Sequence, residues 1–420
     1  MRQYSSKNTS SRSPRDYTIA AGPMGPIGEG EALIIRVNHN CPWNQCLFCP
    51  VYKDRRFRAR SEEEILTDVD TVSRTWELME KTSWDMGLNG RIRPDVVRQV
   101  IADHPGIYGE YRALITPEKQ AALGTLRNVA NWLIRGGKRV FLQDANALAA
   151  KTETLVRILG AMKRAFPMVD TVTCYARSRT LERHSLEDLR ALKEAGLSWA
   201  FVGIESGCDM VLETMKKGVT RKSHIAGGRK FMEAGLQMAA FIMPGLAGSN
   251  EALSLRHLED TIDVLNQIRP NEVRVRSLAV VEHSPLYAMV LSGDFSPPRE
   301  DQMIEELAGI IRGLDFECTF ETLQMTNPLF SVKGPFTRIK ASMLDEIDRF
   351  LALSPLERAR FLLARFVHDG YLDCVEGWGK LDAPLMKLIR EAAGSLERGS
   401  RDAVEKTARA ISAIKSKGIP

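Results

Sequence analysis

The sequence predicts an α/β protein built on a partial (β/α)6 barrel, with an insertion after the first strand and a mainly α-helical C-terminal region. Two observations predict this class. Short apolar runs alternate with amphipathic helical patterns, and the sequence Glu-Ala-Gly-Leu closes two predicted helices, at residues 194–197 and 233–236. Each repeat places glycine at a helix C-cap and leads into a strand. Repeated helix–glycine–strand units indicate a parallel sheet.

Six apolar runs are predicted as the strands of this sheet. Between them, apolar residues recur at steps of three and four, as in Leu155, Ile158 and Leu159, which keeps one helix face against a sheet. In a barrel of this kind the functional loops lie at the carboxyl ends of the strands. The predicted strands cover residues 33–38, 139–142, 171–175, 199–204, 238–243 and 272–278.

The chain is expected to have three parts. Residues 1–30 are rich in Ser, Arg and Gly and predict a mobile leader. Residues 31–290 would form the barrel, with an insertion at about 76–122, where the alternation is interrupted. After the Pro-containing stretch 294–298, residues 296–420 show mostly helical patterns and predict a smaller helical region.

Composition limits the classes of function. The chain has 420 residues, 44% hydrophobic and 26% charged, so it can bury a large core and is long enough to be an enzyme. We find no apolar run of about 18 residues and no apolar h-region at the start, so we expect a cytoplasmic protein without a membrane partner. The net charge of +5 allows an anionic substrate, and nucleic acid is possible but not indicated.

Three of the seven cysteines, Cys41, Cys46 and Cys49, lie together in a short loop directly after the first predicted strand. This grouping is typical of metal ligation and not of a disulfide scaffold. Three thiolates can hold an iron–sulfur cluster and leave one iron without a protein ligand. An iron with an open position is a reaction site.

Three other interpretations of the cysteines stay open. Structural zinc requires four ligands, and His39 is too close to Cys41 for the usual spacing. A plant-type [2Fe–2S] cluster has the observed spacing but needs a fourth cysteine, and none occurs between Cys49 and Cys174. Reduced structural thiols are the third alternative.

The cysteine loop resembles that of the radical S-adenosylmethionine (radical SAM) superfamily. Its members carry three cysteines after strand one of a partial (β/α) barrel, with an aromatic residue before the last cysteine, here Phe48. The commoner spacing has three residues between the first two cysteines, whereas members with a Cys-Pro start have four, as here. Residues 203–209 and 217–220 resemble the strand-four segment of the branch that includes oxygen-independent coproporphyrinogen oxidase, elongator-type enzymes and methylthiotransferases. The resemblance covers roughly residues 31–290.

The resemblance implies two cofactors, a [4Fe-4S] cluster on Cys41, Cys46 and Cys49, and S-adenosylmethionine (SAM) on the open iron. It places Phe48 and Glu205 beside SAM. A carboxylate suits the ribose because it can accept hydrogen bonds from two hydroxyls. An exposed turn acid is the alternative for Glu205.

The other implied SAM contacts follow three more strands. Asp144 would receive the SAM ammonium group, although the usual Gly-Gly-Glu glycines are absent, and Arg177 would hold the methionine carboxylate through its planar guanidinium. Ile242 and Gly245 would approach the adenine, since glycine permits a close backbone approach. A plain turn residue and a surface arginine are the alternatives for Asp144 and Arg177.

Two further features have no assigned role. Cys174 and Cys208 sit at predicted strand ends and could supply a hydrogen atom or an extra ligand, whereas buried inert cysteines are the alternative. A basic run could meet an anionic substrate, a reductant or an RNA backbone, or could be a solvated face. The run consists of Lys53, Arg55, Arg56, Arg58 and Arg60.

The function implied by the resemblance is that of an oxidoreductase-type radical SAM enzyme. A reduced ferredoxin or flavodoxin would supply one electron, and SAM would be cleaved to methionine and a 5′-deoxyadenosyl radical that takes a hydrogen atom from the substrate. The alternative is a non-catalytic iron–sulfur or zinc module in an RNA- or protein-bound assembly. Neither the substrate nor any catalytic residue beyond the cofactor contacts follows from the sequence.

Overall fold

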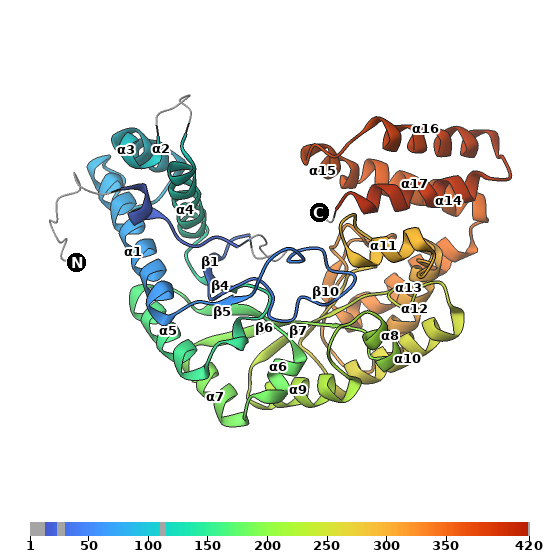
Figure 1. The fold of residues 1–420 in the computed structure, drawn as a ribbon, viewed down its shortest axis with the longest axis horizontal. Helices are drawn as coiled ribbons and strands as arrows, with labels where there is room; N and C mark the ends of the chain where they lie inside the picture. The colour runs from blue at the N-terminus through green and yellow to red at the C-terminus, as the bar shows by residue number, and fades with distance from the viewer. Residues whose placement is uncertain (1–12, 23–29, 110–114, 419–420) are drawn as a thin grey trace. The chain divides into compact units, whose positions relative to one another are not determined.

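The computed structural model describes residues 13–22, 30–109 and 115–418, and its chain divides into two compact units (Figure 1). The first unit consists of Met1–Pro42, Arg56–Tyr175 and Arg190–Trp199. The second unit consists of Trp43–Arg55, Ala176–Leu189 and Ala200–Pro420. The boundary passes through the cysteine loop, so Cys41 belongs to the first unit and Cys46 and Cys49 belong to the second.

The first unit contains three parallel neighbouring strands in the order β1-β4-β5, and β2 pairs with β3 in a small antiparallel ribbon. Helices α1 and α4 contact β1, and α5 contacts α1. The elements are η2 (Pro14–Tyr17, a 3-10 helix), β1 (Leu33–Arg36), β2 (Asn38–His39), β3 (Arg58–Ala59), α1 (Glu62–Asp85), α2 (Pro94–Asp103), α3 (Pro105–Tyr108), α4 (Pro117–Ile134), β4 (Arg139–Gln143), η3 (Ala147–Ala149, a 3-10 helix), α5 (Thr152–Ala165) and β5 (Thr171–Ala176).

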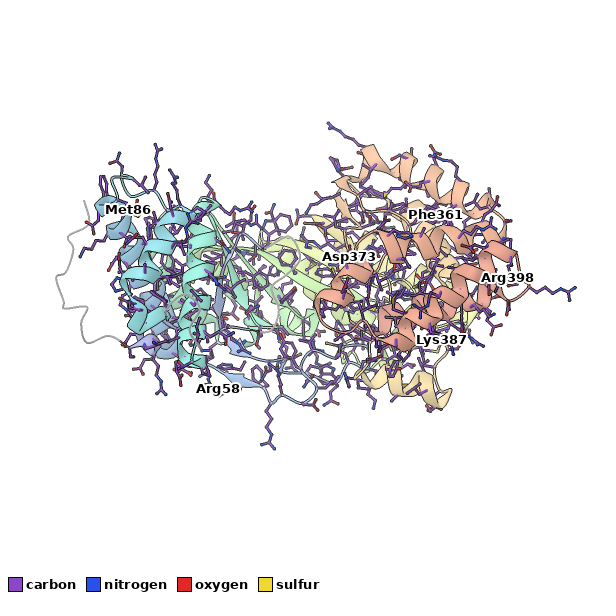
Figure 2. All side chains as sticks on the ribbon, turned by 90° about the horizontal axis from the view of Figure 1, so that it is seen from above. Arg58, Met86, Phe361, Asp373, Lys387 and Arg398 are labelled. Carbon is purple, nitrogen blue, oxygen red and sulfur yellow. The ribbon has the colours of Figure 1, made fainter. Side chains whose placement is uncertain are left out.

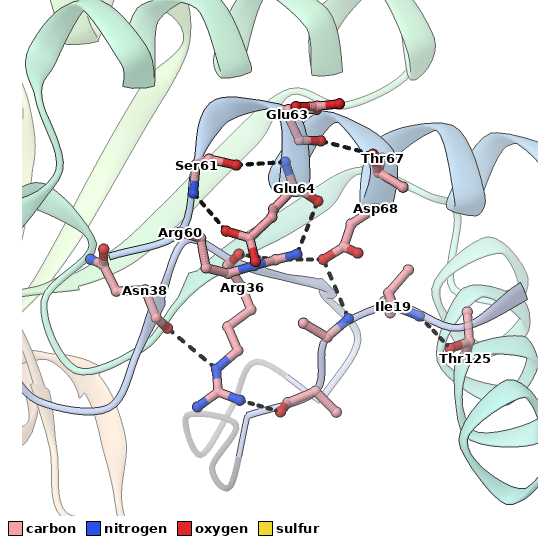
Figure 3. Close-up of polar contacts among 12 residues, drawn as sticks. Ile19, Arg36, Asn38, Arg60, Ser61, Glu63, Glu64, Thr67, Asp68 and Thr125 are labelled. Carbon is pink, nitrogen blue, oxygen red and sulfur yellow. Dashed lines mark hydrogen bonds and ion pairs between the residues drawn. The ribbon is translucent and has the colours of Figure 1, made fainter. Parts of the chain in front are cut away.

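A polar network joins the start of α1 to the end of β1 (Figure 3). Ser61 and Glu64 form a capping box at the N-terminus of α1, which satisfies backbone N–H groups that the helix leaves unpaired. Arg60 donates to the Arg36 carbonyl and forms a buried ion pair with Asp68, each at 2.6 Å. Residues near the N-terminus join this network, because the Ala20 N–H donates to Asp68.

The second unit places its strands in the order β6-β7-β8-β9-β10, with β7, β8 and β9 parallel and β10 antiparallel to β9. Helix α9 contacts both α6 and α10. The elements up to the last strand are α6 (Ser178–Arg183), α7 (Leu186–Ala195, which begins in this unit), β6 (Leu197–Glu205, which ends in this unit), α8 (Asp209–Thr214), α9 (Arg221–Glu233), β7 (Gln237–Ile242), α10 (Glu251–Ile268), β8 (Glu272–Val275), α11 (Pro285–Ser292), α12 (Glu300–Gly313), β9 (Thr319–Glu321) and β10 (Lys333–Pro335).

Five helices end the second unit. Helices α14, α16 and α17 pack on one another around small apolar residues, among them Ala359, Ala392 and Ala410 (Figure 1). Small side chains allow helix axes to approach closely. Phe361, Lys387 and Arg398 lie on the outside of this group (Figure 2). The helices are α13 (Phe336–Ala352), α14 (Pro355–His368), α15 (Tyr371–Gly377), α16 (Ala383–Arg398) and α17 (Ala403–Ser416).

All six predicted strands are present, as β1, β4, β5, β6, β7 and β8, and the mostly parallel sheet is confirmed. The predicted insertion holds the end of α1, all of α2 and α3, and the start of α4. Strands β9 and β10 were not expected, because three-residue strands carry too short an apolar pattern. Closure into a partial barrel and the domain boundaries stay predictions. Among the described residues, no helix has the length and apolarity to cross a membrane.

Gly227 in α9 allows that helix to pack against α6. A Cβ at this position would lie 2.5 Å from the Ser178 carbonyl oxygen and 3.0 Å from the Glu182 nitrogen, both backbone atoms. We therefore expect Gly227→Ala to lower the free energy of unfolding by about 1–3 kcal/mol in a urea titration. Gly124→Ala in α4 is the matched control, because nothing lies within 4 Å of its Cβ, and it should stabilise by up to about 1 kcal/mol. Equal unfolding midpoints for the two variants would contradict the packing argument.

Candidate functional site

The three clustered cysteines lie in the loop after β2, and all three are half-buried. In the described ranges, no group of three or more histidine, cysteine or acidic side chains is arranged to hold a single metal ion. A [4Fe–4S] cluster makes a different demand, because each thiolate ligates its own iron. The donor set, three thiols in one loop, fits a cluster with one open iron. Cluster ligation by Cys41, Cys46 and Cys49 stays a prediction.

The second-unit part of the cysteine loop packs on the segment after α8. The Trp43 indole N–H donates to the Lys216 carbonyl at 2.7 Å, and the Leu47 N–H donates to the Met215 carbonyl at 3.0 Å. Gly218 makes this packing possible, since a Cβ there would lie 2.2 Å from the Trp43 ring. Its φ of +68° also favours glycine. Residues 215–218 therefore hold the loop by backbone and ring contacts together.

Phe48 points its ring into a hydrophobic cluster of the second unit. Phe48 and Leu47 are partly buried against Cys208, Met215 and Met243, which follow β6, α8 and β7 respectively. The Leu47 carbonyl also accepts from the Leu286 N–H at the start of α11, at 2.9 Å. One apolar cluster thus brings together residues from three of the motifs found in the sequence.

Glu205, the predicted ribose contact, forms a buried ion pair with Lys217. Its Oε1 lies 3.1 Å from Lys217 Nζ, and the two side chains are only 12% and 11% exposed. The Lys217 ammonium also lies 5.6 Å from the centre of the Phe48 ring, within cation–π range. Glu205 has a φ of +63°, and its carbonyl accepts from the Met243 N–H at 3.0 Å. The carboxylate is therefore held beside the cysteine loop at the end of β6.

Arg177, the predicted carboxylate contact, packs against both the cysteine loop and the segment after α8. Its guanidinium donates to the Lys217 carbonyl at 2.6 Å and lies 5.1 Å from the centre of the Trp43 ring. Both contacts fix the guanidinium plane, which is the property that bidentate recognition of a carboxylate needs. Arg177, Glu205 and Phe48 thus share Lys217 as a common neighbour.

Asp144, the predicted ammonium contact, lies in the first unit and is fully buried. Its Oδ2 accepts from Arg36 at 2.6 Å and from the Asn40 N–H at 2.7 Å. The other carboxylate oxygen, Oδ1, and the neighbouring Gln143 Oε1 are buried without a hydrogen-bond partner in the described residues. One carboxylate oxygen of Asp144 is therefore bound by Arg36 and Asn40, and the other has no partner among the described residues.

The loop after β7 contains the predicted adenine contacts. Ile242 is completely buried at the strand end, and Gly245 has a φ of +89°. The Gly245 N–H donates to the Glu306 carboxylate at 2.6 Å, and the Ser254 hydroxyl donates to the other Glu306 oxygen. Burial raises the pKa of Glu306 even though these two hydrogen bonds favour its charged form. Glu306, in α12, thereby fixes the backbone of this loop at Gly245.

Two buried histidines support the strand ends. His257 Nδ1 lies 2.7 Å from the Ser206 hydroxyl, and His224 Nδ1 lies 2.6 Å from the Ser178 hydroxyl. Burial lowers the pKa of His257 to about 4 and that of His224 to about 3, where the nearby Arg177 and Lys217 cations add to the effect. Both imidazoles are neutral at pH 7, so each acts here as an uncharged hydrogen-bonding partner of a serine hydroxyl.

Cys174 and Cys208 are both buried. Burial raises the pKa of the Cys174 thiol to about 12, which keeps this group protonated at neutral pH. Cys208 lies in the hydrophobic cluster behind Phe48. These surroundings are those of structural thiols.

No family model matches the chain, but three curated relatives match parts of it, two of which are described below. Over 119 residues, 28% of this chain and 22% of the relative, it is 24% identical to the tRNA uridine(34) acetyltransferase of Methanocaldococcus jannaschii. Over 169 residues, 40% of this chain and 44% of the relative, it is 23% identical to the heme chaperone HemW of Bacillus subtilis. The chain thus spans less than half the length of each of these curated relatives.

Solved structures with similarity include Methanocaldococcus infernus Elp3, with a TM-score of 0.38 and 16% identity over 50% of this chain and 54% of that one. The radical S-adenosylmethionine methyltransferase TsrM of Kitasatospora setae gives a TM-score of 0.38 and 13% identity over 65% of this chain and 44% of that one. The fold is that of a mixed α/β protein with a mostly parallel sheet. These partial sequence matches support the resemblance of this chain to the radical SAM superfamily.

The structure adds partners of the predicted site residues that the sequence reasoning did not assign. Lys217, Trp43 and Glu306 contact predicted site residues, and Arg36 neutralises Asp144. Arg36 had a recognisable signal, because it is the one charged residue in an otherwise apolar first strand. Glu306 had none, since it lies in a helix more than 60 residues after the loop that it holds.

We expect Gly218→Ala to loosen the cysteine loop, because the new methyl group and the Trp43 ring cannot occupy the same space. Iron bound per chain after anaerobic reconstitution should fall, and the free energy of unfolding should drop by about 1–3 kcal/mol. Gly293→Ala is the matched control: its φ of +83° imposes similar backbone strain, but nothing lies within 4 Å of its Cβ. Equal iron content in the two variants would show that the ring contact does not hold the loop.

The buried histidines predict an acid-sensitive fold. Their pKa values are lowered in the folded chain, so the unfolded chain binds more protons between its own pKa of about 6.5 and the folded values. The stabilisation is complete above about pH 6.5 and falls as the pH drops. Each histidine should cost about 2 kcal/mol of unfolding free energy between about pH 7 and pH 5. His257→Gln should flatten this dependence in urea titrations, and an unchanged slope would contradict the assignment.

Proposed function

We propose that this chain is a radical SAM enzyme that reductively cleaves S-adenosylmethionine at a [4Fe-4S] cluster on Cys41, Cys46 and Cys49. The observation that carries the proposal is the packing of the cysteine loop on residues 215–218, which sets Phe48 beside the buried pair of Glu205 and Lys217. A partial barrel that exposes the strand ends to the substrate belongs to the same proposal.

In this proposal, the residues at each strand end contact a different part of the cofactors. The three thiolates hold the cluster, which when bound supplies the electron that breaks the SAM sulfonium and starts radical chemistry. Glu205 accepts hydrogen bonds from the ribose hydroxyls, with Lys217 fixing its orientation. Arg177 grips the methionine carboxylate, and the unused oxygen of Asp144 accepts from the ammonium group.

The apolar residues exclude water from the reaction. Ile242 and Phe48 supply buried surface at two strand ends, and the Gly245 backbone, held by Glu306, allows the adenine to approach. A radical must be shielded from solvent and side reactions, and a rigid apolar wall provides this. A ferredoxin or flavodoxin would supply the electron.

The test is anaerobic reconstitution with iron and sulfide, followed by reduction with dithionite in the presence of SAM. We expect about four irons per chain and release of methionine and 5′-deoxyadenosine, measured by chromatography. Cys46→Ala should lose both the cluster and the cleavage. Cys374→Ala, a half-buried cysteine in α15, should keep both.

Two results would overturn the proposal. Retention of SAM cleavage by Cys46→Ala would remove the assigned ligand. One equivalent of zinc and no iron in protein purified without oxygen would instead favour a non-catalytic metal-binding module.

A further inference from the structure

We propose that residues 53–58, the basic segment, form the docking surface for an acidic electron-donor protein of the ferredoxin or flavodoxin kind. This inference rests on the proposed function, because it concerns how the electron reaches the cysteine loop. The segment has the sequence Lys-Asp-Arg-Arg-Phe-Arg and begins four residues after Cys49.

The basic segment is tied to the cysteine loop through its backbone. Asn44, two residues before Cys46, donates from its side-chain amide to the carbonyls of Tyr52 and Arg55, the latter at 3.3 Å. Lys53 returns a hydrogen bond to the Asn44 carbonyl at 3.0 Å. The segment therefore folds back beside the loop instead of trailing away from it.

A second asparagine makes a similar contact just before the first cysteine. Asn40, in the first unit, donates from its side-chain amide to the Arg56 carbonyl at 2.6 Å. Asn40 and Asn44 both have positive φ values, 68° and 48°, which asparagine tolerates better than most residues. The two amides thus bind the carbonyls of consecutive arginines.

The backbone of the basic segment is bound at Arg55 and Arg56, while the side chains from Arg55 to Arg58 face solvent. Arg55, Arg56 and Arg58 are exposed, and Phe57 is 39% exposed. The ion pairs of the described residues include none with Arg55 or Arg56, and Arg58 forms only an exposed pair with Glu64 (Figure 2 shows Arg58 at the surface). Such exposed pairs are weak, because water and salt screen the two charges.

The charge of the basic segment fits an acidic protein. Four basic side chains stand against one acid, Asp54, within six residues. Electron-transfer encounters use small, transient interfaces, and complementary charge raises their association rate more than their affinity. A short cationic segment beside the cysteine loop is sufficient for such an encounter. One electron leaves the donor and enters the cluster, and no atom is transferred.

The same charges could hold an RNA backbone, with Phe57 stacking on a base. The position of the segment favours the electron donor. Asn40 and Asn44, which flank Cys41, bind two carbonyls and one ammonium group of the basic segment. The segment is therefore hydrogen-bonded to the cysteine loop. Binding to RNA is measured as the alternative in the experiment below.

The test uses Arg55→Glu/Arg56→Glu, which keeps both bound carbonyls. SAM cleavage is measured with two reductants, dithionite and a reduced flavodoxin. We expect dithionite-driven cleavage within about twofold of wild type and at least a tenfold loss in kcat/KM for flavodoxin at low salt. The salt dependence of the flavodoxin reaction should also flatten, since screening acts on the same charges. Lys387→Glu/Arg398→Glu on α16 is the matched control and should leave both reactions unchanged.

Three outcomes would overturn the inference. An equal fall with both reductants would show that the arginines shape the site itself. Unchanged flavodoxin kinetics would show that the segment is a solvated surface without a role in electron transfer. Unchanged flavodoxin kinetics together with lost binding to a fluorescent single-stranded RNA would assign the segment to RNA binding. Absence of cleavage in the wild type with dithionite would instead count against the proposed function.

Discussion

The candidate site depends on the contact between Trp43 and Gly218. The indole ring lies where any side chain at position 218 would have to be, so the cysteine loop and the segment after α8 can pack only with glycine there. That contact sets the neighbours of Lys217, whose ammonium pairs with Glu205 and whose carbonyl accepts from Arg177. One segment of four residues therefore positions the loop, the acid and the guanidinium. Close-packed interiors transmit strain, so a change at this contact also affects the groups packed on it.

Behind these residues, buried polar groups keep the strand ends in one arrangement. A buried carboxylate or imidazole is costly unless it is hydrogen-bonded, so each one fixes the groups that it bonds. Glu306 binds the Gly245 N–H, and His257 binds the Ser206 hydroxyl. The loops after β7 and β6 are thus held by residues that lie on helices. Asp144 differs from both, because one of its oxygens has no partner in the described residues.

The fold was largely predictable because its signals are periodic. Apolar runs and helical spacing located β1, β4, β5, β6, β7 and β8, and the repeated glycine caps indicated that the strands run in parallel. The three residues of β9 and of β10 carry no comparable period, and their place in the sheet comes from hydrogen bonds to strands elsewhere. Short strands are decided by their neighbours and not by their own sequence.

Local order and spacing are enough to show the grouping of Cys41, Cys46 and Cys49 and the acids, arginine and glycine that follow successive strands. The partners of these residues follow from the folded chain alone. Arg36 and Asp144 are 108 positions apart, and Gly245 and Glu306 are 61 apart, so no local pattern could pair them. The pairs form because folding buries one charged or polar group, and a buried charge requires the nearest complementary group wherever it lies in the chain.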